Sequence, residues 1–160
     1  MRHQRLLKQL DAAWTAFKES YAGLSEVQLL VPDVTGAWSV RDIIAHVTTW
    51  EEEALKHLPR ILEGERPPRY SVLYGGIDAF NALMTTGKKR LSLAELFQQQ
   101  EHIHRQLVDA IERAPEDALA SGSRFRRRLR LDTYSHYPKH ARAIRRWRER
   151  QCLPHLRTSL

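Results

Sequence analysis

The sequence predicts an all-α fold, an antiparallel four-helix bundle with a short extra helix between its second and third long helices. Four segments repeat apolar residues at three- and four-residue steps, proline and glycine separate these segments, and no alternating pattern predicts a sheet. A chain of 160 residues can bury one core, so we expect residues 1–160 to form one domain with a tail over about 151–160.

The first two predicted helices are separated by glycine and proline. The first covers about residues 4–22, and Gly23 and Pro32 interrupt the pattern after it. The second begins after Ser39, a helix-capping residue with an acid three positions later, and continues to about Glu63. Its inner stripe comprises Ile43, His46, Val47, Trp50, Ala54, Leu58 and Ile61. The side chains expected to face water are Glu51, Glu52 and Lys56.

The extra helix and the third long helix follow a proline pair at residues 67 and 68. A short helical pattern runs from Ile77 to Met84, and we expect it to lean over one end of the bundle. Ser92 and an acid three residues later form a capping box, which predicts a third long helix that ends before Pro115.

The last part of the chain divides into an irregular stretch and a fourth helix. Residues 116–131 lack a helical period, so we predict no helix there. From Thr133 onward one stripe of a helix contains Thr133, His136, Tyr137, His140, Ile144 and Trp147.

The net charge of +7 is concentrated at the C-terminal end. Residues 1–120 contain 14 of the 26 Lys and Arg and 17 of the 19 Asp and Glu, which leaves 12 basic and 2 acidic residues for residues 121–160. The densest group is Arg124, Arg126, Arg127, Arg128 and Arg130. Such a group suits phosphates or an anionic ligand, but a solvated surface is the favoured interpretation because no aromatic platform or recognition-helix pattern accompanies it. Nucleic acid is therefore allowed as a partner but not favoured.

Composition excludes several classes of protein. No apolar run approaches the roughly 20 residues of a membrane span, and the polar N-terminus does not match a signal peptide. Cys152 is the single cysteine and cannot pair within the chain, which agrees with a reducing compartment. We therefore expect no membrane association and a cytoplasmic location.

Three histidines are candidate metal ligands. His136 and His140 are four residues apart and project from the same face of a helix, and His46 on the second helix is the candidate third ligand. Three imidazoles suit zinc or nickel and leave a position at which the pKa of a water would fall from about 16 toward about 7. The alternative is a set of hydrogen-bonded core histidines without metal. Pro138 would splay the pair unless the helix begins there.

Other candidate residues are weaker. Trp50 and Tyr137 neighbour the histidines in the helical stripes and could line a substrate cavity or belong to the core, and Tyr74 is a further candidate. Glu101 and His104 match half of a di-iron motif, but no second copy occurs, so we reject that site. The residues for which we expect no chemical role are His3, His57, His102, Cys152 and His155, with His57 and His102 exposed or marginal.

Three segments together resemble the DfsB/ClbS branch of the DinB-like superfamily. These segments are GAWSVRDIIAHVTTWE (residues 36–51), YGGIDAFNALM (74–84) and HYPKHARAIRRWRER (136–150), which occur in the family's order over most of the chain. The resemblance implies a four-helix bundle in which a metal is often held by one histidine of the second helix and two of the last. These positions match His46, His136 and His140.

The resemblance also implies functions. Related proteins include thiol-dependent transferases and metal-dependent hydrolases, and the ClbS branch is associated with protection against a DNA-damaging electrophile by hydrolytic opening of a cyclopropane. Our leading hypothesis is a small-molecule hydrolase of this type, with Trp50, Tyr74 and Tyr137 shaping its pocket. The alternatives are a binding protein that shields an electrophile or DNA without turnover, a metal- or thiol-dependent transferase, and a homodimeric bundle with a vestigial site.

Overall fold

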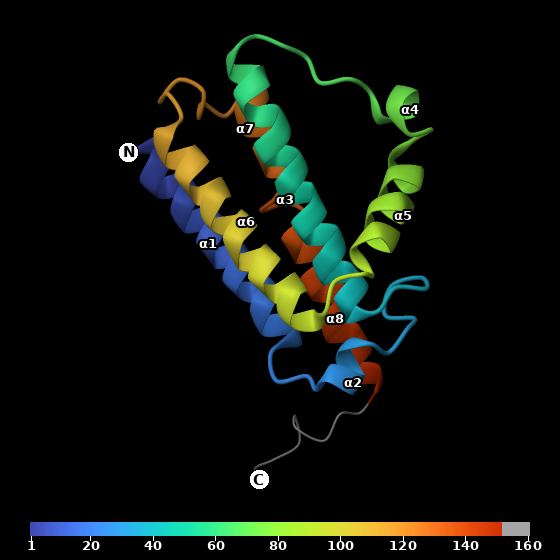
Figure 1. Cartoon of the computed structure of the whole chain (residues 1–160). Helices are drawn as coiled ribbons and strands as arrows, with labels where there is room; N and C mark the ends of the chain where they lie inside the picture. Colours follow the sequence, from blue (N-terminus) through green and yellow to red (C-terminus); the bar gives the residue numbers. More distant parts are fainter. Residues whose placement is uncertain (152–160) are drawn as a thin grey trace.

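Four long helical rods form the body of the protein (Figure 1). The computed structural model describes residues 1–151. Three of the rods are single helices, which are α1 (Arg2–Tyr21), α3 (Val40–Leu62) and α6 (Leu93–Arg113). The fourth consists of two consecutive helices, α7 (Arg124–Asp132) and α8 (Tyr137–Arg150). The described part of the chain forms no strand, so the predicted all-α bundle is confirmed.

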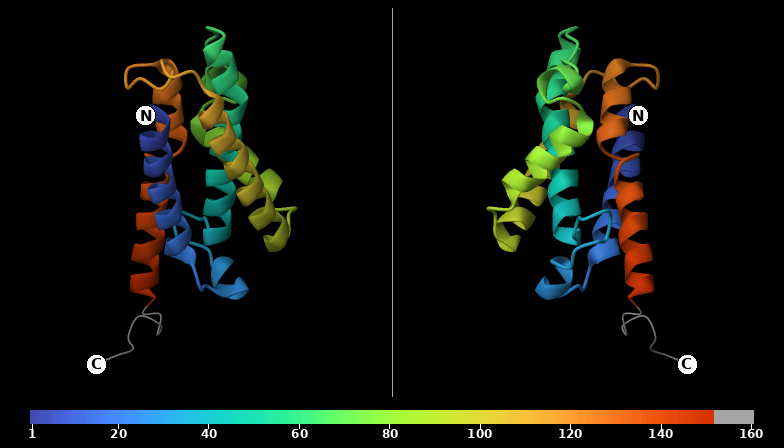
Figure 2. Two further views of the ribbon diagram at one scale, coloured as in Figure 1. Left: turned by 90° about the vertical axis from the view of Figure 1, so that its left-hand side faces the viewer. Right: turned by 90° about the vertical axis from the view of Figure 1, so that its right-hand side faces the viewer.

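The rods lie in two layers, and two rods run in each direction. α1 packs on α8 and α3 packs on α6, which Figure 2 shows as two separate pairs. The colours of Figure 1 show that α1, α7 and α8 descend while α3 and α6 ascend. The connection from α3 to α6 makes this arrangement possible, because it leads the chain back along the flank of the bundle.

That connection contains the predicted extra helix. It includes the one-turn helix α4 (Tyr70–Leu73) and then α5 (Ile77–Lys88), which continues past the predicted end at Met84. α5 packs on α3 and lies beside the bundle rather than inside it (Figure 1). A further one-turn helix, α2 (Glu26–Leu29), lies between α1 and α3. The connection therefore covers the α3 face on which part of the candidate site lies.

Serine caps begin α3 and α6 where the sequence predicts them. The Ser39 side chain accepts a hydrogen bond from the backbone N–H of Asp42, and the Asp42 carboxylate accepts one from the backbone N–H of Ser39. Ser92 and Glu95 form the same reciprocal pair at the start of α6. These caps satisfy N–H groups that have no partner within the helix, and so they fix the first residue of each rod.

The stretch predicted to be irregular contains a helix, and this prediction is wrong. α7 begins after Ser123, whose hydroxyl accepts a hydrogen bond from the backbone N–H of Arg126. Phe125 and Leu129 are four residues apart and buried, so they form a short apolar stripe against α3. Five arginines surround this stripe and hid its helical period in the sequence.

The last helix, predicted from Thr133 onward, begins later in the structure, because a break in helical geometry separates it from α7. The chain departs from helical geometry at Thr133, and α8 begins at Tyr137 with His136 as its N-cap residue. Pro138 thus occupies the first turn of α8, where a missing backbone N–H removes no helical hydrogen bond. The distortion that Pro138 threatened does not arise, because the helix begins beside it.

The described residues share one hydrophobic core, built from all four rods. None of the described helices is long and apolar enough to cross a membrane. The expected tail, with Cys152 and His155, falls almost entirely outside the described residues.

We predict that Leu129→Ala in α7 lowers the free energy of unfolding by about 2–5 kcal/mol, because the residue is fully buried and its truncation leaves a cavity. Leu131→Ala on the same helix is the matched control: Leu131 is 57% exposed, so its truncation should change stability by less than about 0.5 kcal/mol. Urea unfolding followed by circular dichroism measures both. Equal effects of the two substitutions would contradict the packing of α7 against the bundle.

Candidate metal centre

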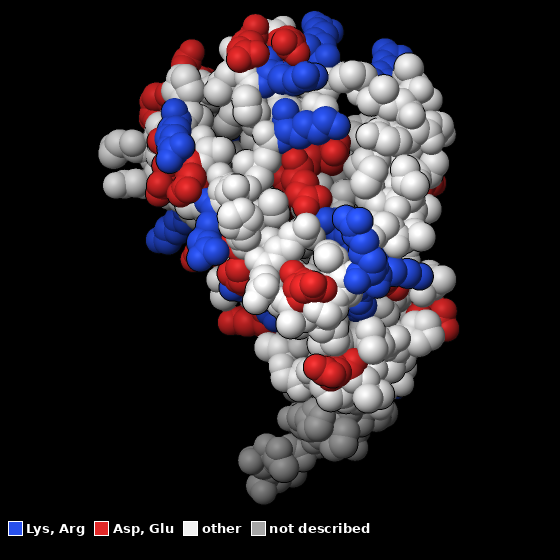
Figure 3. Space-filling view, in the orientation of Figure 1, with Lys and Arg blue, Asp and Glu red and all other residues white. Residues whose placement is uncertain are grey.

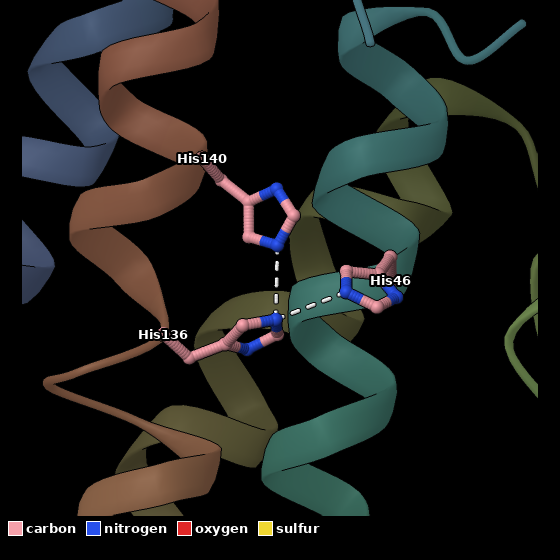
Figure 4. A group of neighbouring side chains, drawn as sticks. All are labelled: His46, His136 and His140. Atoms are coloured by element: carbon pink, nitrogen blue, oxygen red, sulfur yellow. Dashed lines mark hydrogen bonds between the residues drawn. The ribbon is translucent and has the colours of Figure 1, made fainter. Parts of the chain in front are cut away.

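Three histidine side chains from two rods converge at one point inside the bundle (Figure 4). His46 projects from α3, and His136 and His140 project from the start of α8. The Nε2 atom of His136 lies 3.0 Å from Nε2 of His46 and 2.9 Å from Nε2 of His140. One ligand atom from each of the three residues lies within 4.8 Å of the other two. The predicted convergence is confirmed.

Local geometry at the start of α8 keeps the two histidines on one face. His136 has right-handed helical dihedral angles, φ −86° and ψ −48°, although it precedes the first hydrogen-bonded turn. Because the backbone is helical at His136, this residue and His140 lie on the same face of the helix. Both rings turn toward α3. The break at Thr133 allows this by ending α7 before the histidine pair begins.

The hydrogen bonds among these imidazoles cannot all be satisfied. A neutral imidazole nitrogen carries either one proton or one lone pair, yet Nε2 of His136 faces both of the other Nε2 atoms. The second nitrogen of the same ring, Nδ1, is buried without a partner. Three converging nitrogen lone pairs instead match the donor set of a divalent transition metal. The residues present therefore fit a metal ion.

The protonation state of the cluster favours the same role. Burial is the main cause that lowers the pKa of His46 to about 3, of His136 to about 2 and of His140 to about 4. The neighbouring imidazole His140 lowers the first two further, and Lys139 acts in the same direction on His136 and His140. All three rings are neutral at pH 7 and have a free nitrogen lone pair, which metal binding requires.

A cavity of about 390 Å³ opens beside the cluster. Its volume falls in the range of small-molecule sites. The lining residues are His46, Trp50, Tyr70, Ile77, Asn81, Arg128, Leu131, Asp132, His136 and Lys139. The Trp50 indole N–H donates a hydrogen bond to the Asn81 side-chain oxygen at 2.9 Å, which fixes the ring between α3 and α5. The cavity therefore combines apolar walls with a few placed polar groups.

Of the three residues predicted to bind substrate, Trp50, Tyr74 and Tyr137, only Trp50 lines the cavity. Tyr74 packs against Phe80, with ring centroids 4.9 Å apart, and Tyr70 occupies the lining position instead. Tyr137 is fully buried in the core and does not contribute to the lining. The sequence offers two tyrosines four residues apart in the connection, and nothing in it shows which one turns inward.

Tyr137 instead belongs to a buried polar cluster around Glu51. The Tyr137 hydroxyl and the His104 Nδ1–H donate to the same Glu51 oxygen, and the His104 ring stacks on Trp14 with centroids 3.9 Å apart. Glu51 has no exposed surface, so the prediction that it faces water is wrong. Burial is the largest cause that raises its pKa, and the two donors oppose that shift.

A second polar cluster contributes to the wall of the same cavity. Arg128 donates through Nε to the Asp132 carboxylate at 2.5 Å and through Nη2 to the Tyr70 hydroxyl at 2.7 Å. The Tyr70 hydroxyl in turn donates to Glu53 at 2.7 Å, which also lies 3.1 Å from Nε2 of His57. The sequence did not single out the Tyr70, Arg128 and Asp132 positions as cavity residues.

The other histidines within residues 1–151 lie outside the site. His57 is buried beside Glu53, so the expectation of an exposed or marginal position is wrong. His102 is exposed as predicted, and His3 contacts the Glu116 carboxylate at the bundle end. Glu101 forms an ion pair with Lys18 at 3.2 Å and does not pair with His104.

This bundle, with three histidines converging between its second and last rods, defines a class of small helical proteins that carry a candidate transition-metal centre. The chain belongs to the DinB superfamily, whose family profile matches residues 9–144. A solved structure described as "Sibling Lethal Factor Precursor - DfsB" has a TM-score of 0.78 to this chain, covers 93% of this chain and 96% of its own, and is 19% identical. A comparison with curated proteins finds no match. The predicted DinB-like superfamily and the predicted fold are confirmed.

We predict that Tyr137→Phe lowers the free energy of unfolding by about 1–3 kcal/mol, because it removes a donor to the buried Glu51 carboxylate. Zinc affinity should stay unchanged, since the hydroxyl lies outside the cavity lining. Tyr74→Phe is the control, as its hydroxyl makes no hydrogen bond to described residues, and its effect should stay below about 0.5 kcal/mol. Urea unfolding and zinc titration measure the two quantities, and a loss of zinc affinity with unchanged stability would contradict the structural role.

We also predict that the metal-free protein loses stability as the pH falls below 6.5. The three histidines have depressed pKa values when folded and ordinary values near 6.5 when unfolded, so the unfolded chain binds protons first. Each contributes a loss of up to roughly 1.4 kcal/mol per pH unit between about pH 6.5 and its folded pKa. His140→Gln should flatten this dependence in urea unfolding between pH 7 and pH 5, and His102→Gln should leave it unchanged. Parallel pH profiles for the two variants would exclude the buried cluster as the cause.

Proposed function

We propose that this protein is a metal-dependent enzyme of the DfsB/ClbS type that hydrolyses a small electrophilic substrate in the cavity beside the three histidines. The observation that supports the proposal most directly is the convergence of three neutral imidazole nitrogens whose hydrogen bonding remains unsatisfied. His46, His136 and His140 would hold a zinc or nickel ion, and that ion would supply Lewis acidity at the edge of the cavity.

The chain's own residues would bind and orient the substrate. Trp50, Tyr70 and Ile77 form largely apolar walls on which a planar or aliphatic group could pack. Arg128 and Lys139 line the same cavity and would stabilise negative charge that develops on a substrate oxygen. Substrate recognition and charge stabilisation would thus come from neighbouring side chains of one cavity.

The proposed reaction is the hydrolytic opening of a cyclopropane activated by a carbonyl group. The water oxygen forms a bond to one ring carbon, and a carbon–carbon bond of the ring breaks. Its electron pair passes into the adjoining carbonyl group, and the proton released by water returns to the carbon that lost the bond. Water is the only co-reactant, and atoms and charge balance.

We predict that the chain, purified without an affinity tag, binds one equivalent of zinc. Loss of an outer partner of a metal ligand costs about 10–100-fold in affinity, so removing a direct ligand by His46→Gln should cost at least about 100-fold. His102→Gln removes an exposed histidine and serves as the matched control. Calorimetric titration and metal analysis measure the affinities. Equal zinc binding by all three proteins would refute the ligand assignment.

Turnover distinguishes an enzyme from a binding protein. The zinc-loaded chain is incubated with the diethyl ester of a cyclopropane bearing two carboxyl groups on one carbon, and ring opening is followed by proton NMR. We expect many equivalents of opened product per protein molecule with the parent chain and none above background with His46→Gln. Stoichiometric association without product would overturn the hydrolase proposal and assign protection by binding.

A further inference from the structure

A groove rich in arginine adjoins the cavity. It has a volume of about 520 Å³ and contains no acidic side chain in its lining. The lining residues are Ile61, Arg66, Pro67, Pro68, Arg124, Arg127, Arg128 and Leu131. Arg128 and Leu131 also line the cavity beside the histidines, so the two hollows meet at these side chains.

Three of the four arginines in this groove keep their positive charge uncompensated. Within residues 1–151, no carboxylate forms an ion pair with Arg66, Arg124 or Arg127. Arg124 makes only long hydrogen bonds to backbone carbonyls, at 3.4 and 3.5 Å, and Arg127 one at 3.4 Å. On the face shown in Figure 3, in contrast, acidic and basic side chains are mixed over α1 and α6. The groove therefore combines an excess of positive charge with walls formed partly by apolar residues.

Arg128 is held rigidly at the junction of the two hollows. Its Nε and Nη2 atoms are engaged by Asp132 and by the Tyr70 hydroxyl, and its guanidinium carbon lies 5.8 Å from the Tyr70 ring centroid. Its Nη1 atom donates to no described residue. The two N–H bonds of Nη1 thus remain available for a molecule that reaches from the groove into the cavity.

We propose that the substrate of the cavity is a small organic acid whose carboxylate, phosphate or sulfonate group binds the guanidinium groups of Arg66, Arg124 and Arg127. Its apolar part extends past Arg128 and Leu131 to the walls formed by Trp50 and Tyr70. Guanidinium groups recognise such anions through paired N–H donors. This proposal rests on the proposed function for the position of the reacting end, but anion binding itself needs no metal.

A small anion fits the groove better than a nucleic acid does. The groove shares Arg128 and Leu131 with a cavity of about 390 Å³, a volume that suits a small molecule and not a duplex. Its lining contains no aromatic ring on which a base could stack. The basic segment predicted as a solvated surface thus contributes three arginines to a site of limited size.

The test compares two probes that differ in charge but scarcely in shape, naphthaleneacetate and naphthaleneacetamide. Calorimetric titration of the metal-free and the zinc-loaded full chain should show that the carboxylate binds at least about 10-fold more tightly than the amide in both forms. Arg66→Gln with Arg127→Gln should reduce the ratio to about 2 or less, because both side chains are exposed and their loss removes charge without disturbing the core. Arg105→Gln with Arg113→Gln on α6 changes the net charge equally and should preserve the ratio.

Two outcomes would overturn the anion site. One is equal affinity for the two probes, and the other is an equal loss of preference in both double variants, which would assign the effect to overall charge. A DNA duplex that binds the parent chain but not the Arg66 and Arg127 variant, and that displaces the carboxylate probe, would assign the groove to nucleic acid instead. Absence of zinc binding would defeat the proposed function alone, since the probe preference is measured separately on metal-free protein.

Discussion

The buried Glu51 carboxylate connects all four rods of the bundle. It lies on α3, accepts hydrogen bonds from Tyr137 on α8 and from His104 on α6, and reaches α1 through the stacking of His104 on Trp14. A carboxylate without exposed surface is costly unless it accepts hydrogen bonds, so packing that brings Tyr137 and His104 to Glu51 lowers the cost of burying it. Tyr137 adjoins His136 in the sequence, so the buried carboxylate and the candidate metal centre meet at the start of α8.

The second polar cluster, around Tyr70 and Arg128, joins the segments that form the cavity. Tyr70 in the connection after α3 bonds to Glu53 on α3, and Arg128 on α7 bonds to Tyr70. These bonds attach the connection and α7 to α3 beside the cavity, in addition to the apolar contacts that Phe125 and Leu129 make with α3. The cavity walls consequently depend on polar contacts as well as on apolar burial. Removal of one partner would leave another buried polar group unsatisfied, and such groups are more costly than lost apolar area on a half-exposed segment.

The sequence predicts those elements that have a clear helical repeat of apolar residues or a capping residue, and it does not predict the others. Strong helical stripes and serine caps identify α1, α3 and α6, and the spacing of His136 and His140 predicts their common face. α7 escapes prediction because only Phe125 and Leu129 repeat within a run of arginines. The burial of Glu51 and His57 is not predicted, because a charged or polar residue is ordinarily assigned to the surface. Only the hydrogen-bond partners that tertiary packing brings to such a residue allow it to be buried.

The electrostatics of the candidate site and of the groove favour one kind of ligand. Burial keeps the three histidines neutral, so they would add no negative charge to offset a divalent ion that they bind. The arginine groove likewise has no acidic lining residue, and in the cavity Asp132 is engaged by Arg128. The uncompensated charges of the groove and of Lys139 in the cavity would therefore attract an anion, and low-dielectric walls would strengthen that attraction. A neutral substrate would gain little binding energy from these positive charges. An acid would be stabilised at its anionic group in the groove and again at its reacting end, where negative charge develops. Binding and reaction would therefore depend on the same positive charges.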